Sequence, residues 1–183
     1  MQTKTLITLF GKKILGTYVH YIMRLDYGKM QGNQRAELKM HCITDNPEKM
    51  IDAVFTKALS EKITKQNQKK CDEFIFSNVL DEIVGTVSVM YRDGNDIEYR
   101  IRNIDAFIYN VYTIASERGK GYAGSMIRLL MEMLHEKGID QAYLCVRTNN
   151  ESAIRAYQKL GFVTEGTKCF IRFMGINIPY HIL

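Results

Sequence analysis

The sequence of 183 residues contains only four cysteines, and no two of them form a C-x-x-C pair. Cys42, Cys71, Cys145 and Cys169 stand at irregular separations, so neither a zinc site nor a disulfide framework is indicated. We therefore expect reduced, mostly buried thiols, no bound metal and a cytoplasmic location.

Long apolar runs are also absent from the sequence. The longest stretches, such as LITLF at residues 6–10, are far shorter than the roughly 20 residues that a membrane-crossing helix needs. No signal-peptide cleavage site follows them. We expect no membrane span and no cleaved leader.

A strong excess of one charge is lacking as well. The chain has 25 Lys and Arg against 20 Asp and Glu, a formal net charge of +5. The lysine pairs at 12–13 and 69–70 are scattered. Such a modest excess suits an anionic small ligand better than a nucleic-acid track, so we expect no nucleic-acid partner.

Internal repeats and low-complexity linkers are absent too, and a chain of this length with 46% apolar residues suffices for one substantial core. In the first 34 residues, apolar positions recur at helical spacing and predict a helical N-terminal extension. Its basic residues would also allow a helix on a membrane surface, but an ordinary helix covering the core is favoured. The apolar positions are Leu6, Phe10, Ile14, Tyr18, Ile22 and Leu25.

From residue 35 onward the pattern predicts alternating strands and helices. The acidic pair Asp81-Glu82 separates two β-rich runs and predicts a hairpin. Asn46-Pro47 marks the beginning of one helix and Gly138 the end of another. In order, the predicted elements are a strand at 36–44, a helix at 45–64, strands at 73–80, 83–91 and 106–114, a helix at 124–138, a strand at 141–146, a helix at 150–160 and two closing strands around 174–177.

The stretch RGKGYAG at residues 118–124 fits more than one phosphate-binding loop. Its three glycines satisfy the dinucleotide fingerprint G-x-G-x-x-G. That fingerprint belongs near the start of a doubly wound unit, and too few residues follow Gly124 to complete one. The next predicted strand also ends at Arg147-Thr148 rather than at an acidic residue that would hold a ribose. A Walker loop fails as well, because Gly124-Ser125 lacks the preceding lysine.

Starting at Arg118, the same stretch reads R-x-x-G-x-A, through Gly121 and Ala123. Residues 150–162, NESAIRAYQKLGF, follow the pattern N-x-x-A-x-x-x-Y-x-x-x-G-F. These two spaced motifs resemble the signatures of the GNAT superfamily of N-acetyltransferases. The second motif matches at Asn150, Ala153, Tyr157, Gly161 and Phe162.

The resemblance implies an α/β fold with a mixed, mostly antiparallel central sheet flanked by helices. It covers the chain from about residue 35, so we expect an N-terminal extension at 1–34 and an acetyltransferase domain at 35–183. In this family the strand before the loop and the strand after the next helix begin parallel and then splay. Here these would be residues 107–114 and 141–147.

The resemblance also implies acetyl-CoA as the acetyl donor. Amide N–H groups of residues 119–124, at a helix N-terminus, would hold the pyrophosphate, and the main chain of 111–113 would hold the pantetheine arm. Asn150 would contact the cofactor, cap the helix that starts there, or do both. The implied cofactor-binding residues are Val111, Tyr112, Thr113, Arg118, Gly119, Lys120, Gly121, Tyr122, Ala123, Gly124 and Asn150.

Tyr157 is the implied catalytic residue, a general acid that protonates the departing thiolate. Its helical spacing from Ala153 and Leu160 would also suit a core tyrosine. Related enzymes place a base glutamate where this chain has Cys145 or Phe107. The remaining candidates for the base, each as readily a surface group, are Glu82, Glu98, Asp105 and His181.

The sequence thus predicts an acetyl-CoA-dependent N-acetyltransferase that acts on a primary amine of a small molecule or protein in a ternary complex. Cys145 is expected to be a buried thiol and not a nucleophile, because no histidine stands near it in sequence. The missing base leaves a second class open, a non-catalytic acyl-CoA-binding sensor or partner module. The sequence does not specify whether the acceptor amine belongs to a small molecule or to a peptide. It also leaves open whether the protein forms a homodimer.

Overall fold

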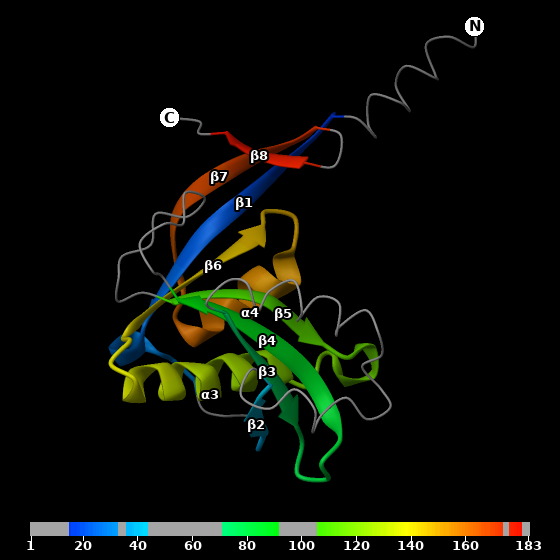
Figure 1. The fold of residues 1–183 in the computed structure, drawn as a ribbon, viewed down its shortest axis with the longest axis vertical. Helices are drawn as coiled ribbons and strands as arrows, with labels where there is room; N and C mark the ends of the chain where they lie inside the picture. The colour runs from blue at the N-terminus through cyan, green and yellow to red at the C-terminus, as the bar shows by residue number, and fades with distance from the viewer. Residues whose placement is uncertain (1–14, 33–35, 44–70, 92–105, 174–175, 181–183) are drawn as a thin grey trace, which may run out of the picture.

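A computed structural model describes residues 15–32, 36–43, 71–91, 106–173 and 176–180 of the chain (Figure 1). Its strands are β1 (Leu15–Asp26), β2 (Lys39–Cys42), β3 (Cys71–Ser77), β4 (Ile83–Tyr91), β5 (Ala106–Thr113), β6 (Gln141–Arg147), β7 (Val163–Phe173) and β8 (Ile176–Tyr180). Its helices are α3 (Tyr122–Glu136) and α4 (Glu151–Leu160), with single 3-10 turns η1 (Tyr27–Lys29) and η3 (Ala115–Glu117).

Within the described residues the strands form one eight-stranded sheet in the order β2-β3-β4-β5-β6-β1-β7-β8. Neighbouring strands run antiparallel except β5 and β6, which are parallel. A parallel pair needs a crossover connection, and α3 supplies it. This mixed sheet with packed helices confirms the predicted fold class.

One apolar cluster holds α3 and α4 to the sheet. The inward face of α3 follows the predicted 3.6-residue period, and Met126, Ile127, Leu130, Met131 and Leu134 are fully buried on it. Burial of each such side chain contributes about 1.5–3 kcal/mol. From α4 the cluster takes Tyr157 and Leu160, which therefore sit beside the α3 helix. Residues of both helices therefore pack in the same apolar cluster as residues of β5 and β6.

The helix predicted for residues 1–34 is wrong for residues 15–26, which form β1. This strand is hydrogen-bonded on both sides, to β6 and to β7. Met23 and Leu25 are fully buried, whereas Ile22 and Arg24 are half-buried on the other face, an alternation typical of a strand. Pairing on two edges satisfies the main-chain polar groups and overrides the local helical spacing. Residues 1–14 lie outside the described residues, and the predicted boundary at residue 34 stays a prediction.

The other described elements agree with the sequence pattern to within a few residues. The strand predicted at 36–44 is β2, and the two runs around Asp81-Glu82 are the antiparallel pair β3 and β4. The side-chain oxygen of Asn78 accepts hydrogen bonds from the Leu80 and Glu82 amides and closes this hairpin turn. The helix predicted at 45–64 lies outside the described residues.

Candidate active site

The parallel strands β5 and β6 start together and then separate, as Figure 1 shows. Their pairing covers three positions and ends where Ile108 faces Leu144. Beyond that point β5 continues to Thr113 and β6 to Arg147 without pairing to each other, while β5 stays paired with β4 and β6 with β1. The wedge expected from the sequence resemblance is therefore present, and among the described strands none pairs with the edge of residues 110–113 that faces away from β4.

A β-bulge in β5 lies at the point of separation. Ser88 of β4 pairs with Tyr109 and Thr86 with Tyr112, so two residues of β5 face one residue of β4. One of the two is Asn110, whose φ of 50° lies in the left-handed region. Asparagine enters this region more readily than most side chains. The bulge turns β5 away from β6, and the sequence reasoning did not predict it.

Gly85 of β4 allows the end of β5 and the helix α3 to approach closely. A Cβ atom at Gly85 would overlap the main-chain oxygen of Tyr112 and lie 2.9 Å from the Met126 sulfur. Only a glycine leaves room here, because the Tyr112 main chain of β5 and the Met126 side chain of α3 both approach this backbone position. Gly85 therefore allows the end of β5 to pair closely with β4 while α3 packs against the same position.

The loop before α3 presents a group of amide donors. Gly119 and Gly121 have φ values of 81° and 87°, and this alternation of backbone conformation turns successive N–H groups toward one point. Within the described residues, the N–H groups of 119–123 donate to no main-chain carbonyl. They stand at the N-terminus of α3, whose dipole favours a negative charge. The loop thus has the donor set and the polarity of a phosphate site.

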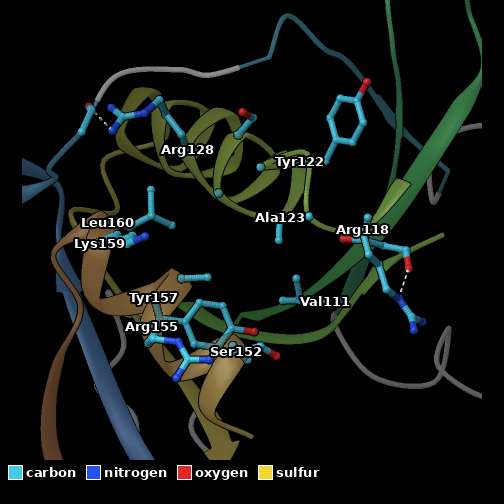
Figure 2. A pocket seen from close by; sticks show the side chains of 18 of the residues that line it. Val111, Arg118, Tyr122, Ala123, Arg128, Ser152, Arg155, Tyr157, Lys159 and Leu160 are labelled. Carbon is cyan, nitrogen blue, oxygen red and sulfur yellow. Dashed lines mark hydrogen bonds between the residues drawn. The ribbon is translucent and has the colours of Figure 1, made fainter. Parts of the chain in front are cut away.

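A cavity of about 890 Å³ lies in front of the wedge, between the loop, α3 and α4. It brings together residues from β5, the loop and both helices, as Figure 2 shows. The predicted site residues that line it are Val111, Tyr112, Thr113, Arg118, Gly119, Gly121, Tyr122, Ala123, Gly124, Asn150 and Tyr157. Of the predicted site residues, only Lys120 is outside this lining.

Arg118 and Lys120 are held by protein groups. The Nε of Arg118 donates to the Thr113 carbonyl at 3.1 Å, and its guanidinium lies 5.7 Å from the centre of the Tyr112 ring. Arg118 therefore ties the loop back to the end of β5. The Lys120 ammonium pairs with both oxygens of Glu117, at 2.9 and 3.0 Å, and this hydrogen bond raises the pKa of Lys120. The Lys120 side chain is thus paired with Glu117 and is not part of the cavity lining.

Tyr157 is fixed by the end of its own helix. The N–H of Gly161 donates to the Gln158 carbonyl and the N–H of Phe162 to the Tyr157 carbonyl, a Schellman ending in which Gly161 has a φ of 99°. The Phe162 ring packs on the Tyr157 ring at 5.7 Å between centroids. Figure 2 shows the Tyr157 ring extending from α4 toward Val111 of β5.

Burial determines the acid-base behaviour of Tyr157. The residue is 8% exposed, and desolvation raises the pKa of its phenol to about 12. Within the described residues, no hydrogen bond to a protein group satisfies the hydroxyl. At neutral pH the Tyr157 hydroxyl is therefore protonated, and it can donate a hydrogen bond to a ligand in the cavity.

Asn150 caps α4, one of the two roles that the sequence allowed. Its side-chain oxygen accepts from the Ala153 amide at 3.4 Å and from the Ser152 hydroxyl at 3.1 Å. It also lines the cavity, so a contact with a cofactor is sterically open to it.

The residues considered for the base do not meet at the cavity. Glu82 accepts a hydrogen bond from the Asn78 amide in the β3–β4 turn, and Cys145 is a half-buried residue of β6 outside the lining. Glu98, Asp105 and His181 lie outside the described residues. Among the described lining residues the one carboxylate is Glu117, which Lys120 neutralises.

Several lining residues were missed by the sequence reasoning. Arg155 and Lys159 lie on α4 four positions apart and two positions from Tyr157, so helical spacing from that tyrosine did not indicate them. Arg128 lies on α3, and its Nη2 donates to the carbonyls of Gln31 and Gly32, each at 2.5 Å. No signal in the sequence connects the turn at 31–32 with residue 128.

Comparisons with known proteins agree with this geometry. A 28% identical segment of 110 residues, 51% of this chain and 38% of the relative, matches GCN5-related N-acetyltransferase 6, chloroplastic, of Arabidopsis thaliana. Mycothiol acetyltransferase of Corynebacterium aurimucosum is 32% identical over 62 residues, 34% of this chain and 20% of that protein. The chain therefore spans well under half the length of these curated relatives.

Solved structures show the same fold at low identity. A GNAT-family structure from Novosphingobium aromaticivorans superposes with a TM-score of 0.59 at 17% identity, covering 85% of this chain and 64% of that one. The model of the acetyltransferase (GNAT) family matches residues 40–162, more than half of the chain. The chain belongs to this family. β1 and the turn at 31–32 precede the matched region.

None of the helices in the described ranges combines the length and the apolar character that a bilayer crossing requires.

Proposed function

We propose that this chain is an acetyl-CoA-dependent N-acetyltransferase that transfers the acetyl group to a primary amine of a small molecule or protein by direct attack in a ternary complex. One observation carries the proposal. The wedge between β5 and β6 opens onto a cavity that has a phosphate-binding loop at one side and a protonated tyrosine at the other. A linear ligand with a diphosphate and a reactive end fits this arrangement.

The donor set fits coenzyme A. The N–H groups of 119–123 would bind the diphosphate, and a Cβ built at Gly119 would meet nothing within 4 Å, so the space in front of the loop is open. The edge of β5 at residues 111–113 that faces away from β4 would bind the pantetheine amides in the manner of an added strand. When bound, acetyl-CoA supplies an activated acetyl group as a thioester.

Main-chain donors of β5 near Val111 would polarise the acyl carbonyl, because they are fixed before the ligand arrives. Tyr157 would donate a hydrogen bond to the sulfur as the carbon–sulfur bond breaks, and any proton that it passes to the thiolate would be replaced from solvent. Its pKa of about 12 lies above that of an ordinary thiol, about 8.5. Tyr157 therefore stays protonated in the resting protein and acts first as a hydrogen-bond donor to the developing thiolate.

The proton of the attacking amine needs an acceptor outside the described cavity lining, because Glu117 is paired with Lys120. Solvent or a group elsewhere would take it. The same observation favours a second candidate function, a module that binds acyl-CoA without catalysis. A cytoplasmic location and a homodimer stay predictions.

The first experiment measures ligand binding. Acetyl-CoA should raise the melting temperature of the protein, whereas NADPH should not. A shift with NADPH and none with saturating acetyl-CoA would contradict the proposal. Release of free thiol from acetyl-CoA across a panel of primary amines then separates the two candidate functions, because a pure binder releases none.

A further inference from the structure

The charged residues that line the cavity are mostly basic. Four cations contribute to the described lining, namely Arg118, Arg128, Arg155 and Lys159. The single acidic residue there, Glu117, is neutralised by Lys120. If the amide groups of 119–123 bind a diphosphate, these four side-chain cations remain for a further anionic group.

Three of these cations already have protein partners. Arg118 is bound to the Thr113 carbonyl, and Arg155 pairs with Glu151 at 3.0 Å. Arg128 holds the carbonyls of Gln31 and Gly32. Lys159 has no hydrogen bond or ion pair within the described part of the chain. Its ammonium is therefore the cation that is available to a ligand.

Lys159 and Arg128 both line the cavity near the turn at Gly32. A Cβ atom at Gly32 would lie 3.6 Å from the Lys159 carbonyl oxygen and 3.9 Å from Arg128 Nη2. Figure 2 shows both side chains at the end of the cavity opposite Arg118, with Leu160 nearby. Arg128 stands seven positions after Gly121, a rise of about 10 Å along α3. This end thus lies a short distance beyond the phosphate loop.

We propose that Lys159 binds the 3′-phosphate of coenzyme A, assisted by the guanidinium nitrogens of Arg128 that do not hold the 31–32 turn. The proposal rests on the proposed function, because it assumes that the loop at 119–123 holds the diphosphate. In coenzyme A one ribose joins the 5′-diphosphate to the 3′-phosphate. A second anionic group is therefore expected near the loop, and the Gly32 end of the cavity provides its cations.

The turn at 31–32 comes from the part of the chain before the family match. Arg128 binds both of its carbonyls, so the turn is held at a fixed distance from α3. The cavity is thereby bounded at this end by a segment that lies outside the family match. The 31–32 turn together with Lys159 and Arg128 would then favour coenzyme A over a form that lacks the 3′-phosphate.

The test compares the affinities of coenzyme A and 3′-dephospho-coenzyme A by isothermal titration calorimetry, without turnover. The wild-type protein should bind coenzyme A about tenfold more tightly, as one charged hydrogen bond contributes. Lys159→Gln should remove this difference and leave the affinity for the dephospho form unchanged. Lys159→Arg should retain it. Lys137→Gln, an exposed lysine at the far end of α3, is the matched control and should behave as wild type.

Each other outcome has a distinct meaning. If the wild-type protein binds both forms equally, or if Lys159→Gln weakens both forms alike, the 3′-phosphate assignment is overturned and the proposed function stands. If the wild-type protein binds neither form, the proposed function itself fails, and the assignment to Lys159 fails with it.

Discussion

The Phe162 amide donates to the Tyr157 carbonyl at 3.1 Å while the two rings pack at 5.7 Å and an interplanar angle of 54°. The residue that ends α4 therefore also holds the tyrosine that reaches into the cavity. Gly161 lies between them in the left-handed conformation that this ending requires. The glycine and phenylalanine at the end of the second motif thus have a positional role toward Tyr157.

Substituting Tyr157 by Phe tests the proposed acid. Tyr157→Phe removes the hydroxyl and retains the ring that packs on Phe162. We expect kcat to fall by at least about tenfold, because general-acid assistance typically contributes more than this. The affinity for acetyl-CoA should change little. Steady-state kinetics with the best amine and calorimetric titration give the two values, and an unchanged kcat would remove Tyr157 from the mechanism.

Substituting Gly161 by Ala tests the α4 ending. A Cβ atom at Gly161 would lie 2.6 Å from the Lys29 carbonyl oxygen, and the φ of 99° strains any other residue. We expect Gly161→Ala to lower the free energy of unfolding by about 2 kcal/mol or more, measured by urea denaturation. Gly28→Ala is the control, since its Cβ would meet nothing within 4 Å. Equal stability of the two variants would contradict this role.

Gly85→Ala should affect both stability and cofactor affinity. The added methyl group must displace the Tyr112 main chain or the Met126 side chain, so we expect a loss of about 1–3 kcal/mol. Because Tyr112 lies on the edge proposed for pantetheine, the affinity for acetyl-CoA should also fall. Gly166→Ala, in the strand β7, should change neither property, because its Cβ faces open space. Intact acetyl-CoA affinity in a folded Gly85→Ala protein would argue against pantetheine binding there.

His20 should make stability depend on pH. It lies on β1 opposite Arg147 and Lys168, and burial together with Arg147 lowers its pKa below the ordinary value of 6.5. Below pH 6.5 the unfolded chain therefore binds more protons at this position than the folded chain. Stability should fall as the pH drops from about 6.5 toward the folded pKa, and it should be unaffected by His20 above that range.

The measurement for His20 is a series of thermal or urea melts between pH 8 and pH 5. His20→Gln should show a shallower decrease in stability across this interval than the wild-type protein. His41→Gln, at an exposed position of β2 for comparison, should retain the wild-type slope. A His20→Gln profile parallel to that of the wild type would show that His20 does not contribute.

Much of the site could be predicted because its parts are local. The positive φ values of Gly119 and Gly121, the Asn150 cap and the Gly161 ending all depend on a few consecutive residues. Such short-range geometry is encoded directly in residue type, since glycine permits left-handed backbone and asparagine accepts from a nearby amide. The described strands and helices from residue 36 onward also followed their hydrophobic periods.

The sequence by itself determined the glycine loop at 118–124, the helix α3 that follows it and the position of Tyr157 on the next helix, α4. Only the tertiary structure decided that residues 15–26 are a strand between β6 and β7, that β5 has a bulge at Asn110 where it leaves β6, and that Arg128 binds the 31–32 turn. These features come from contacts between residues far apart in the chain. Their free energy depends on pairing and burial in the folded state, which local spacing does not record.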